Sequence, residues 1–510
     1  MKNKKLFLKI TGASSAIVIS FGVALGLVFA GRTNPYIDFD DPSDTISYAA
    51  TPLKTEWNVS DKTVANAIKF QNANELDWPV NKQESTFDKY TYAALCIDGA
   101  DHLILDKGFN QSGYQGLVNW VWTNHWYRNQ QTVPISNPQP TYDPAKSGSA
   151  NGVLPTSNNS SDFWKTYSDL IQHGAKSLVL PGYMHQDGLS NFKNQPNSIY
   201  SAAGYILLDA NTADDLNIAS IVFRSDEAAF MTGIATCQYL NDNFAEYGKN
   251  GLSVGTFGGV NIPTVTIYMG GFEQGVIAWN NNIEKIAQYH QDQGESGWDN
   301  PEAHKVNFIN LGKTDSYFSN SFAIGDGKPL VQALLQRGAD AILPVAGPQT
   351  IDTVKEIQAY GSSCIVVGVD TAQELDTNTN GRSVYKDVNG DANVIKFSAT
   401  KNIAGITSQI LSLSYAGLPD DSTFTSGDPK VGSYGYLTVG NTENDGIAPS
   451  EYSYRYIEEF ITSVTDGVTP PDDAIYTWIL EELSGLPPPD GTQESYFDWL
   501  SQPENMVFKI

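Results

Sequence analysis

Several polar and aromatic side chains stand where short apolar runs of the sequence end. Asp209 closes "YILLD", Asp370 closes "CIVVGVD" and Tyr268 follows "GGVNIPTVTI". Carboxylates can fix the edge of a planar ring or the hydroxyl groups of a sugar, and aromatic side chains can stack on a ring. A single Asp or Asn at such a turn is usually a helix N-cap, but the shared placement favours a small-molecule site. The candidate ligand-binding residues from this pattern are Asp106, Phe109, Asn110, Asp209, Tyr268, Gly347 and Asp370.

The motifs that would indicate an enzyme or a metal protein fail on inspection. Residues 251–255, GLSVG, match G-x-S-x-G, but a hydrolase needs a strand before the serine and a helix after it, whereas here a strand follows Ser253. The acids of "DVNGDAN" lack the glycine and the glutamate of a calcium loop. Six scattered histidines and three cysteines have no zinc-ligand spacing. We therefore predict a binding protein with no enzymatic activity, no cofactor and no metal.

The charge of the chain argues against nucleic acid as a partner. Acidic residues outnumber basic residues by 57 to 31, for a formal net charge of −26, and no run of Lys or Arg follows residue 10. Binding to a phosphate backbone needs a basic surface. The acidity is typical of a solvated surface and points to no particular function.

The N-terminus predicts export across a membrane. Four lysines, Lys2, Lys4, Lys5 and Lys9, precede the 21 apolar residues 10–30. That length spans a bilayer as a helix, and the lysines would keep its start in the cytoplasm. Residues 1–31 are thus either an export signal or an uncleaved anchor, and residues 32–89 are a polar tether. The rest of the chain is expected on the outside of the cell membrane.

The remaining pattern predicts parallel sheets with crossover helices. Short apolar runs alternate with segments that have apolar residues at helical spacing, such as residues 226–242 and 327–340. The strand–helix units are too many for a single sheet of ordinary size and favour two doubly wound lobes. In such folds, ligands bind beyond the carboxyl ends of the strands. Residues 128–162 and 376–393, rich in Asn, Ser, Pro and Gly, are expected to be surface loops, and residues 469–510 a C-terminal extension without an assigned role.

Six blocks of the sequence, in order, resemble the basic membrane protein family, the purine-nucleoside receptor-like substrate-binding proteins of ABC transporters. The resemblance covers about three-quarters of the chain, and the insertions and tail are similar to the enlarged versions of wall-less bacteria. The blocks are "DKGFNQSGYQGL", "ASIVFRSDEAAFMTGIA", "VGTFGGVNIPTVTIYMGGFEQGVIAWN", "LLQRGADAILPVAG", "VVGVD" and "SATKNIAG". The family implies a two-lobed type I periplasmic-binding-protein fold, here with residues 90–224 in lobe 1, 225–395 in lobe 2 and 396–468 returning to lobe 1.

The resemblance also implies roles for individual residues. Phe109 and Tyr268 would stack on the two faces of a nucleoside base, with Asn110 as a polar neighbour. Asp209 would contact the base edge, while Asp370 and the lysine of "SATK", Lys401, would hold the ribose. A close approach of the backbone to the sugar is implied at Gly347.

The chain departs from the family pattern at three places. No cysteine for lipid attachment lies near the leader, so anchoring by the N-terminal helix is expected instead. Ala372 and Met269 stand where relatives often carry an acid. The sequence is thus interpreted as a membrane-anchored protein that binds a nucleoside and presents it to the transmembrane subunits of an ABC permease. The family resemblance implies a purine base in that nucleoside. A surface adhesion or scaffold protein that keeps the fold without binding a ligand is the alternative.

Overall fold

The computed structural model describes most of the chain between residues 159 and 465 and shorter pieces before it. Within 159–465 the described residues exclude 173–174, 176, 213–214, 216, 376–384, 386–392, 417–436 and 441–445; the earlier pieces are 45–46, 56–59, 68–69, 93–97, 109–110, 112–113, 116–117, 133–134 and 153–155. The predicted leader 1–31, Asp106, most of the two predicted surface loops and the extension 469–510 lie outside the described residues.

Lobe 1 is built on an eight-stranded sheet. Its strands are ordered β3-β2-β15-β9-β8-β7-β4-β6, parallel from β15 to β6 and antiparallel where β2 and β3 join. The apolar runs of the sequence form the central strands because both faces are buried. The strands are β2 (Glu56–Val59), β3 (Ile68–Lys69), β4 (Ala93–Ile97), β6 (Val153–Pro155), β7 (Ser177–Pro181), β8 (Gly204–Leu208), β9 (Ile218–Phe223) and β15 (Leu437–Gly440).

Lobe 2 is built on a six-stranded sheet of order β11-β10-β12-β13-β14-β16, parallel except for β16. Its strands are β10 (Leu252–Gly258), β11 (Val306–Phe308), β12 (Ala341–Val345), β13 (Ile365–Asp370), β14 (Ile395–Lys401) and β16 (Ile447–Pro449). A separate pair, β1 (Thr45–Ile46) and β5 (Val133–Pro134), completes the described strands. The predicted class, two α/β lobes with mainly parallel sheets, is confirmed.

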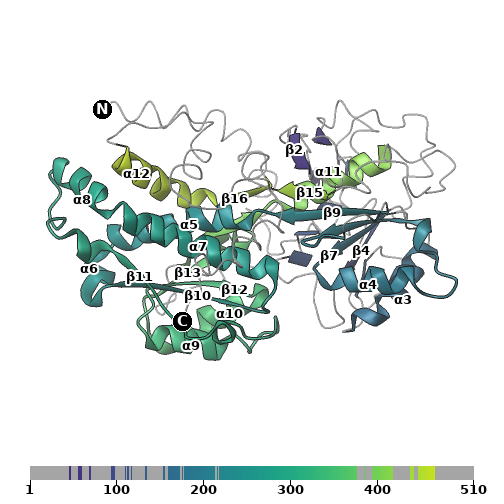
Figure 1. The fold of residues 1–510 in the computed structure, drawn as a ribbon, viewed down its shortest axis with the longest axis horizontal. Helices are drawn as coiled ribbons and strands as arrows, with labels where there is room; N and C mark the ends of the chain where they lie inside the picture. The colour runs from purple at the N-terminus through teal and green to yellow at the C-terminus, as the bar shows by residue number, and fades with distance from the viewer. Residues whose placement is uncertain are drawn as a thin grey trace.

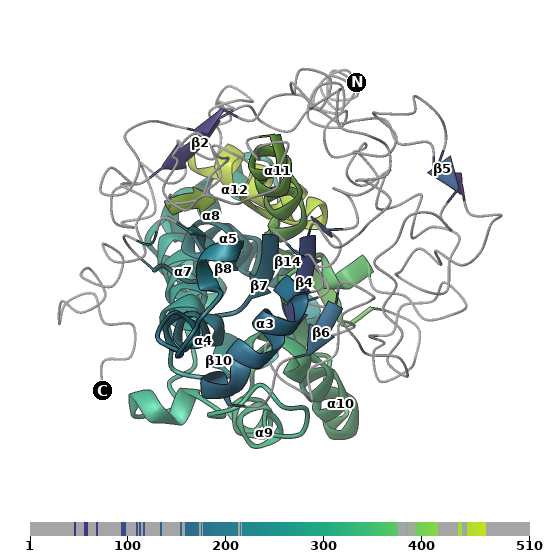
Figure 2. The same ribbon diagram turned by 90° about the vertical axis from the view of Figure 1, so that its right-hand side faces the viewer.

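Helices cover both faces of each sheet (Figure 1). In lobe 1, α3 and α4 pack together on one face, and α11 contacts β7 and β8 from the other. Figure 2 shows α3 and α4 near the viewer. In lobe 2, α5 and α7 lie on one face and α9 and α10 on the other. The helices are α3 (Phe163–Gln172), α4 (Met184–Lys193), α5 (Ser225–Asp242), α6 (Phe244–Tyr247), α7 (Pro263–Asn281), α8 (Ile283–Asp292), α9 (Lys328–Gln336), α10 (Thr350–Tyr360), α11 (Ile403–Ala416) and α12 (Tyr454–Val464).

The described elements require the chain to pass between the lobes three times. It crosses from β9 to α5, from β14 to α11, and from β15 to β16. The stretch 396–468, expected in lobe 1, is therefore divided: α11 and β15 join lobe 1, whereas β14, β16 and α12 join lobe 2. The stretch is divided because β15 pairs with β9 in the sheet of lobe 1, whereas β14 and β16 pair with each other in the sheet of lobe 2.

Helices α5 and α7 pack in close backbone contact beside the first crossing. A Cβ atom added to Gly271 would collide with the backbone of Asp226, and one added to Gly275 would collide with the carbonyl of Phe230. Small residues allow this approach. Nearly all of α5 is buried, so it forms the centre of the core.

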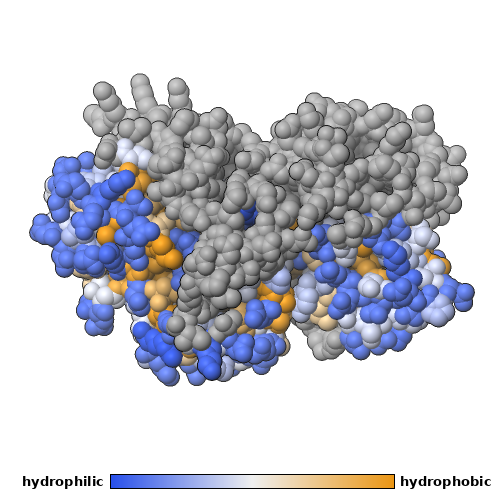
Figure 3. Space-filling model, in the orientation of Figure 1, coloured by the Kyte–Doolittle hydropathy of each residue, from blue (hydrophilic) through white to orange (hydrophobic). Residues whose placement is uncertain are grey.

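The surface in view is largely hydrophilic, and the three cysteine thiols are buried. The outer ends of both lobes are mostly hydrophilic in Figure 3. Cys96, Cys237 and Cys364 are buried free thiols, and burial raises the pKa of each well above its usual value. Among the described residues, no helix is long and apolar enough to cross a membrane, and no group of His, Cys, Asp and Glu could hold a metal ion.

Candidate functional site

Two of the candidate acids occupy strained backbone positions at strand ends. Asp209 directly follows β8 with φ 64°, and Asp370 is the last residue of β13 with φ 63°. The left-handed region costs a residue other than glycine roughly 1 kcal/mol or more, and such positions are concentrated at functional sites. Only two other described non-glycine residues have positive φ, Asn197 and Asn320. The geometry is therefore consistent with functional placement of both carboxylates.

Lys401 joins these two acids across the lobes. Its Nζ donates a hydrogen bond to Asp209 Oδ2 at 2.7 Å and lies 3.3 Å from Asp370 Oδ1. Lys401 ends β14 in lobe 2, whereas Asp209 follows β8 in lobe 1, so the carboxyl ends of strands from both sheets meet here. The Lys401 side chain is 2% exposed. A buried ammonium needs this pairing with carboxylates because charge is costly to remove from water.

Three aromatic rings surround the ammonium. The Nζ atom of Lys401 lies 4.9 Å from the ring centroid of Tyr268, 5.3 Å from that of Phe109 and 5.6 Å from that of Phe223. These distances allow cation–π attraction. The Tyr268 hydroxyl also donates a hydrogen bond to Asp370 Oδ1 at 3.1 Å. We call Lys401, Asp209, Asp370, Tyr268 and Phe109 the Lys401 cluster.

Burial and charge act in opposite directions on the pKa values in this cluster. Burial raises the pKa of Asp209 to about 6, although Lys401 favours its ionised form. Burial alone would lower the pKa of Lys401, but the attraction of Asp209 and Asp370 outweighs it and holds that pKa above its usual value. The ammonium therefore remains charged at neutral pH, and Asp209 takes up a proton as the pH falls through about 6.

The three other predicted site residues are Asn110, Gly347 and Asp106. Asn110 is buried beside Phe109. Gly347 follows β12, and in the sheet β13 lies between β12 and β14. The φ of Gly347 is 52°, in the left-handed region, and a Cβ atom added there would meet no other atom within 4 Å. Asp106 lies outside the described residues. The structure thus brings five of the eight predicted residues together in the Lys401 cluster.

The placement of Tyr268 at a strand end is wrong. Tyr268 lies in α7, which begins at Pro263 one turn earlier. Proline is well suited to the first turn of a helix, since it has no N–H to leave unpaired there. The apolar run "GGVNIPTVTI" suggested a strand, but its residues from Pro263 onward belong to the helix that follows β10.

Phe223 was not predicted as a neighbour of the site. It is the last residue of β9 and is 1% exposed, so "IASIVF" looks like uniform core sequence. The rule applied to the acids, that the last residue of a parallel strand faces the ligand edge, would have selected it.

Arg224 follows Phe223 and forms a bidentate buried pair with Asp226 at the first crossing, with 2.8 Å between Arg224 Nη2 and Asp226 Oδ2.

Two mainly parallel sheets, three crossings and polar strand ends that meet between the lobes define the class as a periplasmic-binding-protein-like α/β protein. A comparison with protein families gives a match over part of the chain. Residues 92–297 match the Bmp family of PnrA-like ABC transporter substrate-binding proteins, which confirms the resemblance to the basic membrane protein family. This is a family of solute-binding proteins and not of enzymes.

Individual relatives are distant in sequence. An uncharacterised lipoprotein of Mycoplasma pneumoniae, the MG040 homologue, is 25% identical over 424 residues, covering 71% of this chain and 62% of the relative. The nucleoside-binding protein BmpA of an ABC transporter from Lactococcus lactis is 24% identical over 314 residues, covering 60% and 70%. The chain spans less than two thirds of the length of the Mycoplasma pneumoniae relative. A solved ABC transporter solute-binding protein from Aeropyrum pernix is 19% identical, with 77% and 86% of the two chains covered and a TM-score of 0.42.

Proposed function

We propose that this chain captures a purine nucleoside between its two lobes and delivers it to an ABC permease. The observation that carries the proposal is the Lys401 cluster, in which Asp209 of lobe 1 meets Asp370 and Lys401 of lobe 2. These groups offer carboxylate acceptors and an ammonium donor beside the rings of Phe109 and Tyr268. A nucleoside has the matching parts: a flat base, an edge with N–H donors, and a sugar with vicinal hydroxyl groups.

Each part of the ligand has a partner in this proposal. Phe109 and Tyr268 stack on the base, Asp209 accepts a hydrogen bond from its edge, and Asp370 and Lys401 bind the ribose hydroxyls. Because the contacts come from both lobes, the ligand stabilises the arrangement in which the lobes are together. The permease then recognises that arrangement, and the ligand undergoes no chemical change.

Anchoring by the apolar residues 10–30, with the lobes outside the cell, is part of the proposal. The Mycoplasma relatives are named as lipoproteins, and a lipid anchor needs a cysteine at the end of the leader. The first cysteine in this sequence is Cys96, which is buried in β4. Deletion of residues 1–31 should therefore release the protein from the membrane fraction to the soluble fraction. Retention of the truncated chain on membranes would contradict this anchor.

Isothermal titration of the full chain with adenosine, guanosine, inosine, cytidine, uridine and ribose tests the function. We expect purine nucleosides to bind with micromolar or lower Kd and ribose alone to bind far more weakly. Asp370→Ala should weaken nucleoside binding by about ten- to hundredfold, since a hydrogen bond to a charged group contributes about 1.5 to 3 kcal/mol. No binding by the folded protein across this panel would favour the surface scaffold instead.

A further inference from the structure

The ring and the hydroxyl of Tyr268 have different surroundings. The ring lies beside the ammonium of Lys401, with 4.9 Å between its centroid and Nζ. The hydroxyl points to the end of β13, where it donates to Asp370 Oδ1 at 3.1 Å, and Ala399 O is 3.4 Å away as a second acceptor. Burial and the nearby Asp370 and Asp209 raise the pKa of Tyr268 well above its usual value. The hydroxyl therefore keeps its proton and acts as a donor.

The two oxygens of Asp370 are not equivalent. Oδ1 faces both the Tyr268 hydroxyl at 3.1 Å and the Lys401 ammonium at 3.3 Å. Among the described residues, Oδ2 of Asp370 has no hydrogen-bond donor. The carboxylate side chain is 15% exposed, so it is accessible at the edge of the buried cluster. Two donors thus fix one oxygen and leave the other available to a ligand.

From this asymmetry we propose that Tyr268 is a positioning residue that selects ligands with free ribose hydroxyls. Its hydroxyl holds the Asp370 carboxylate so that Oδ2 accepts hydrogen bonds from the vicinal hydroxyls of the sugar. The inference rests on the proposed function, because it concerns the sugar half of the same site. A site built to accept a hydroxyl proton disfavours an analogue without it, since the bound analogue covers the carboxylate oxygen and leaves it unpaired.

The test compares adenosine with 2′,3′-dideoxyadenosine, which has the same base and no vicinal hydroxyls. The wild-type full chain should bind adenosine at least tenfold more tightly. Tyr268→Phe keeps the ring and removes the hydroxyl, so affinity for adenosine should fall about three- to tenfold. Affinity for the dideoxy compound should change less than twofold. Titration calorimetry gives both values, and thermal unfolding shows that the variant is folded.

Two further variants separate positioning from a general effect of losing a hydroxyl. Tyr247→Phe removes another largely buried hydroxyl, one that donates to Ser363 O at 3.2 Å, and should leave both affinities unchanged. In an Asp370→Asn background, Tyr268→Phe should have little additional effect, because the residue acts through the carboxylate.

Two outcomes would overturn the inference in distinguishable ways. An equal loss of affinity for both ligands in Tyr268→Phe would show that the hydroxyl only supports the fold around the base. Binding of neither ligand by the wild-type chain would instead remove the proposed function, and the role of Tyr268 with it.

Discussion

Lys401 Nζ lies 2.7 Å from Asp209 Oδ2, and this buried ion pair joins residues 192 positions apart on different lobes. Lys401 Nζ also lies 3.3 Å from Asp370 Oδ1, so two carboxylates at the ends of β8 and β13 share a single ammonium. The cluster is consequently both a candidate binding site and a contact that holds the lobes together. Changes to it should affect stability and ligand binding at once.

Replacing Lys401 by Met should strongly destabilise the protein. It leaves the buried Asp209 and the half-buried Asp370 without their cation. Removal of one partner from a buried pair costs about 3 to 5 kcal/mol. The loss should be smaller at pH 5 than at pH 7.5, since a protonated Asp209 no longer needs a cation. Urea unfolding at the two pH values measures both effects.

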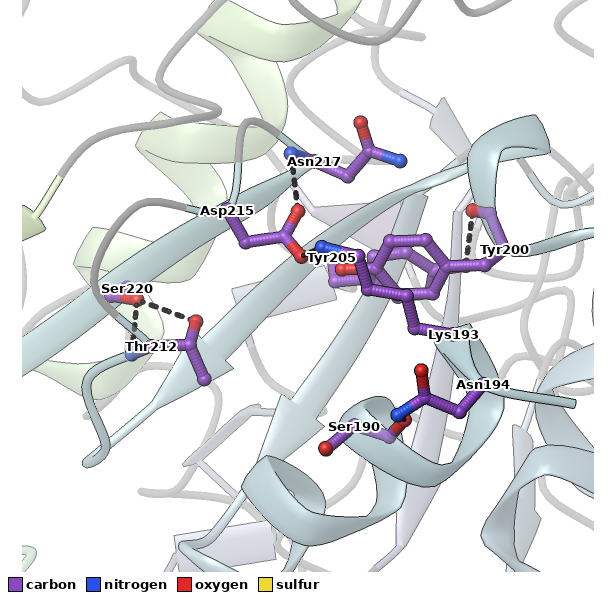
Figure 4. Close-up of polar contacts among 9 residues, drawn as sticks. All are labelled: Ser190, Lys193, Asn194, Tyr200, Tyr205, Thr212, Asp215, Asn217 and Ser220. Atoms are coloured by element: carbon purple, nitrogen blue, oxygen red, sulfur yellow. Dashed lines mark hydrogen bonds and ion pairs between the residues drawn. The ribbon is translucent and has the colours of Figure 1, made fainter.

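The matched control is the exposed pair of Lys193 and Asp215 in lobe 1 (Figure 4). Its Nζ–Oδ2 distance is 2.8 Å, but the Lys193 side chain is 58% exposed, so solvent screens the attraction. Lys193→Met should cost less than about 1 kcal/mol. Equal losses from the two substitutions would show that the contact between the lobes adds no stability of its own.

Phe109 offers the cleanest test of base stacking. It is only partly buried, whereas Tyr268 is 1% exposed and its truncation to Ala would leave a hole in the core. Stacking of a base on an aromatic ring contributes about 1 to 3 kcal/mol, so Phe109→Ala should weaken nucleoside binding by about five- to hundredfold. Phe109→Leu, which keeps an apolar side chain of similar size, should lose nearly as much in titration calorimetry. Wild-type affinity in the Leu variant would mean that Phe109 serves only as apolar surface.

The main strands could be predicted because they are short apolar runs. The rule that ligands lie beyond the carboxyl ends of parallel strands then selected Asp209 and Asp370. The same rule was wrong for Tyr268. The apolar run before this residue looks like a strand, but helix α7 begins at Pro263 and packs against α5. Lys401 was identified only through family resemblance. A lysine at the end of a half-polar strand looks like a surface residue, and nothing local reveals that its partner is Asp209 on the other sheet.

The pH dependence of binding should follow the ionisation of Asp209. Its pKa of about 6 lies above that of the unfolded chain, so this group alone makes the free energy of unfolding rise as the pH falls from about 6 toward 4. Binding should change in the opposite direction, because protonation removes the carboxylate acceptor for the base edge. We expect nucleoside affinity to fall between pH 7.5 and pH 5. Asp209→Asn should bind more weakly at pH 7.5 with a flatter profile, and an unchanged profile in that variant would assign the titration to another group.

The contact of α7 with α5 should set the position of Tyr268. Gly271 lies one turn after Tyr268, directly against the backbone of Asp226. The methyl group of Gly271→Ala has no space unless α7 moves away, which should cost about 1 to 3 kcal/mol as overpacking does. Ile277→Ala on the same helix is the control: its side chain is 39% exposed, so the change should be small. Because moving α7 displaces both the ring and the hydroxyl of Tyr268, Gly271→Ala should also weaken nucleoside binding, while Ile277→Ala should not. Loss of stability in Gly271→Ala with wild-type affinity would show that α7 can shift without disturbing the site.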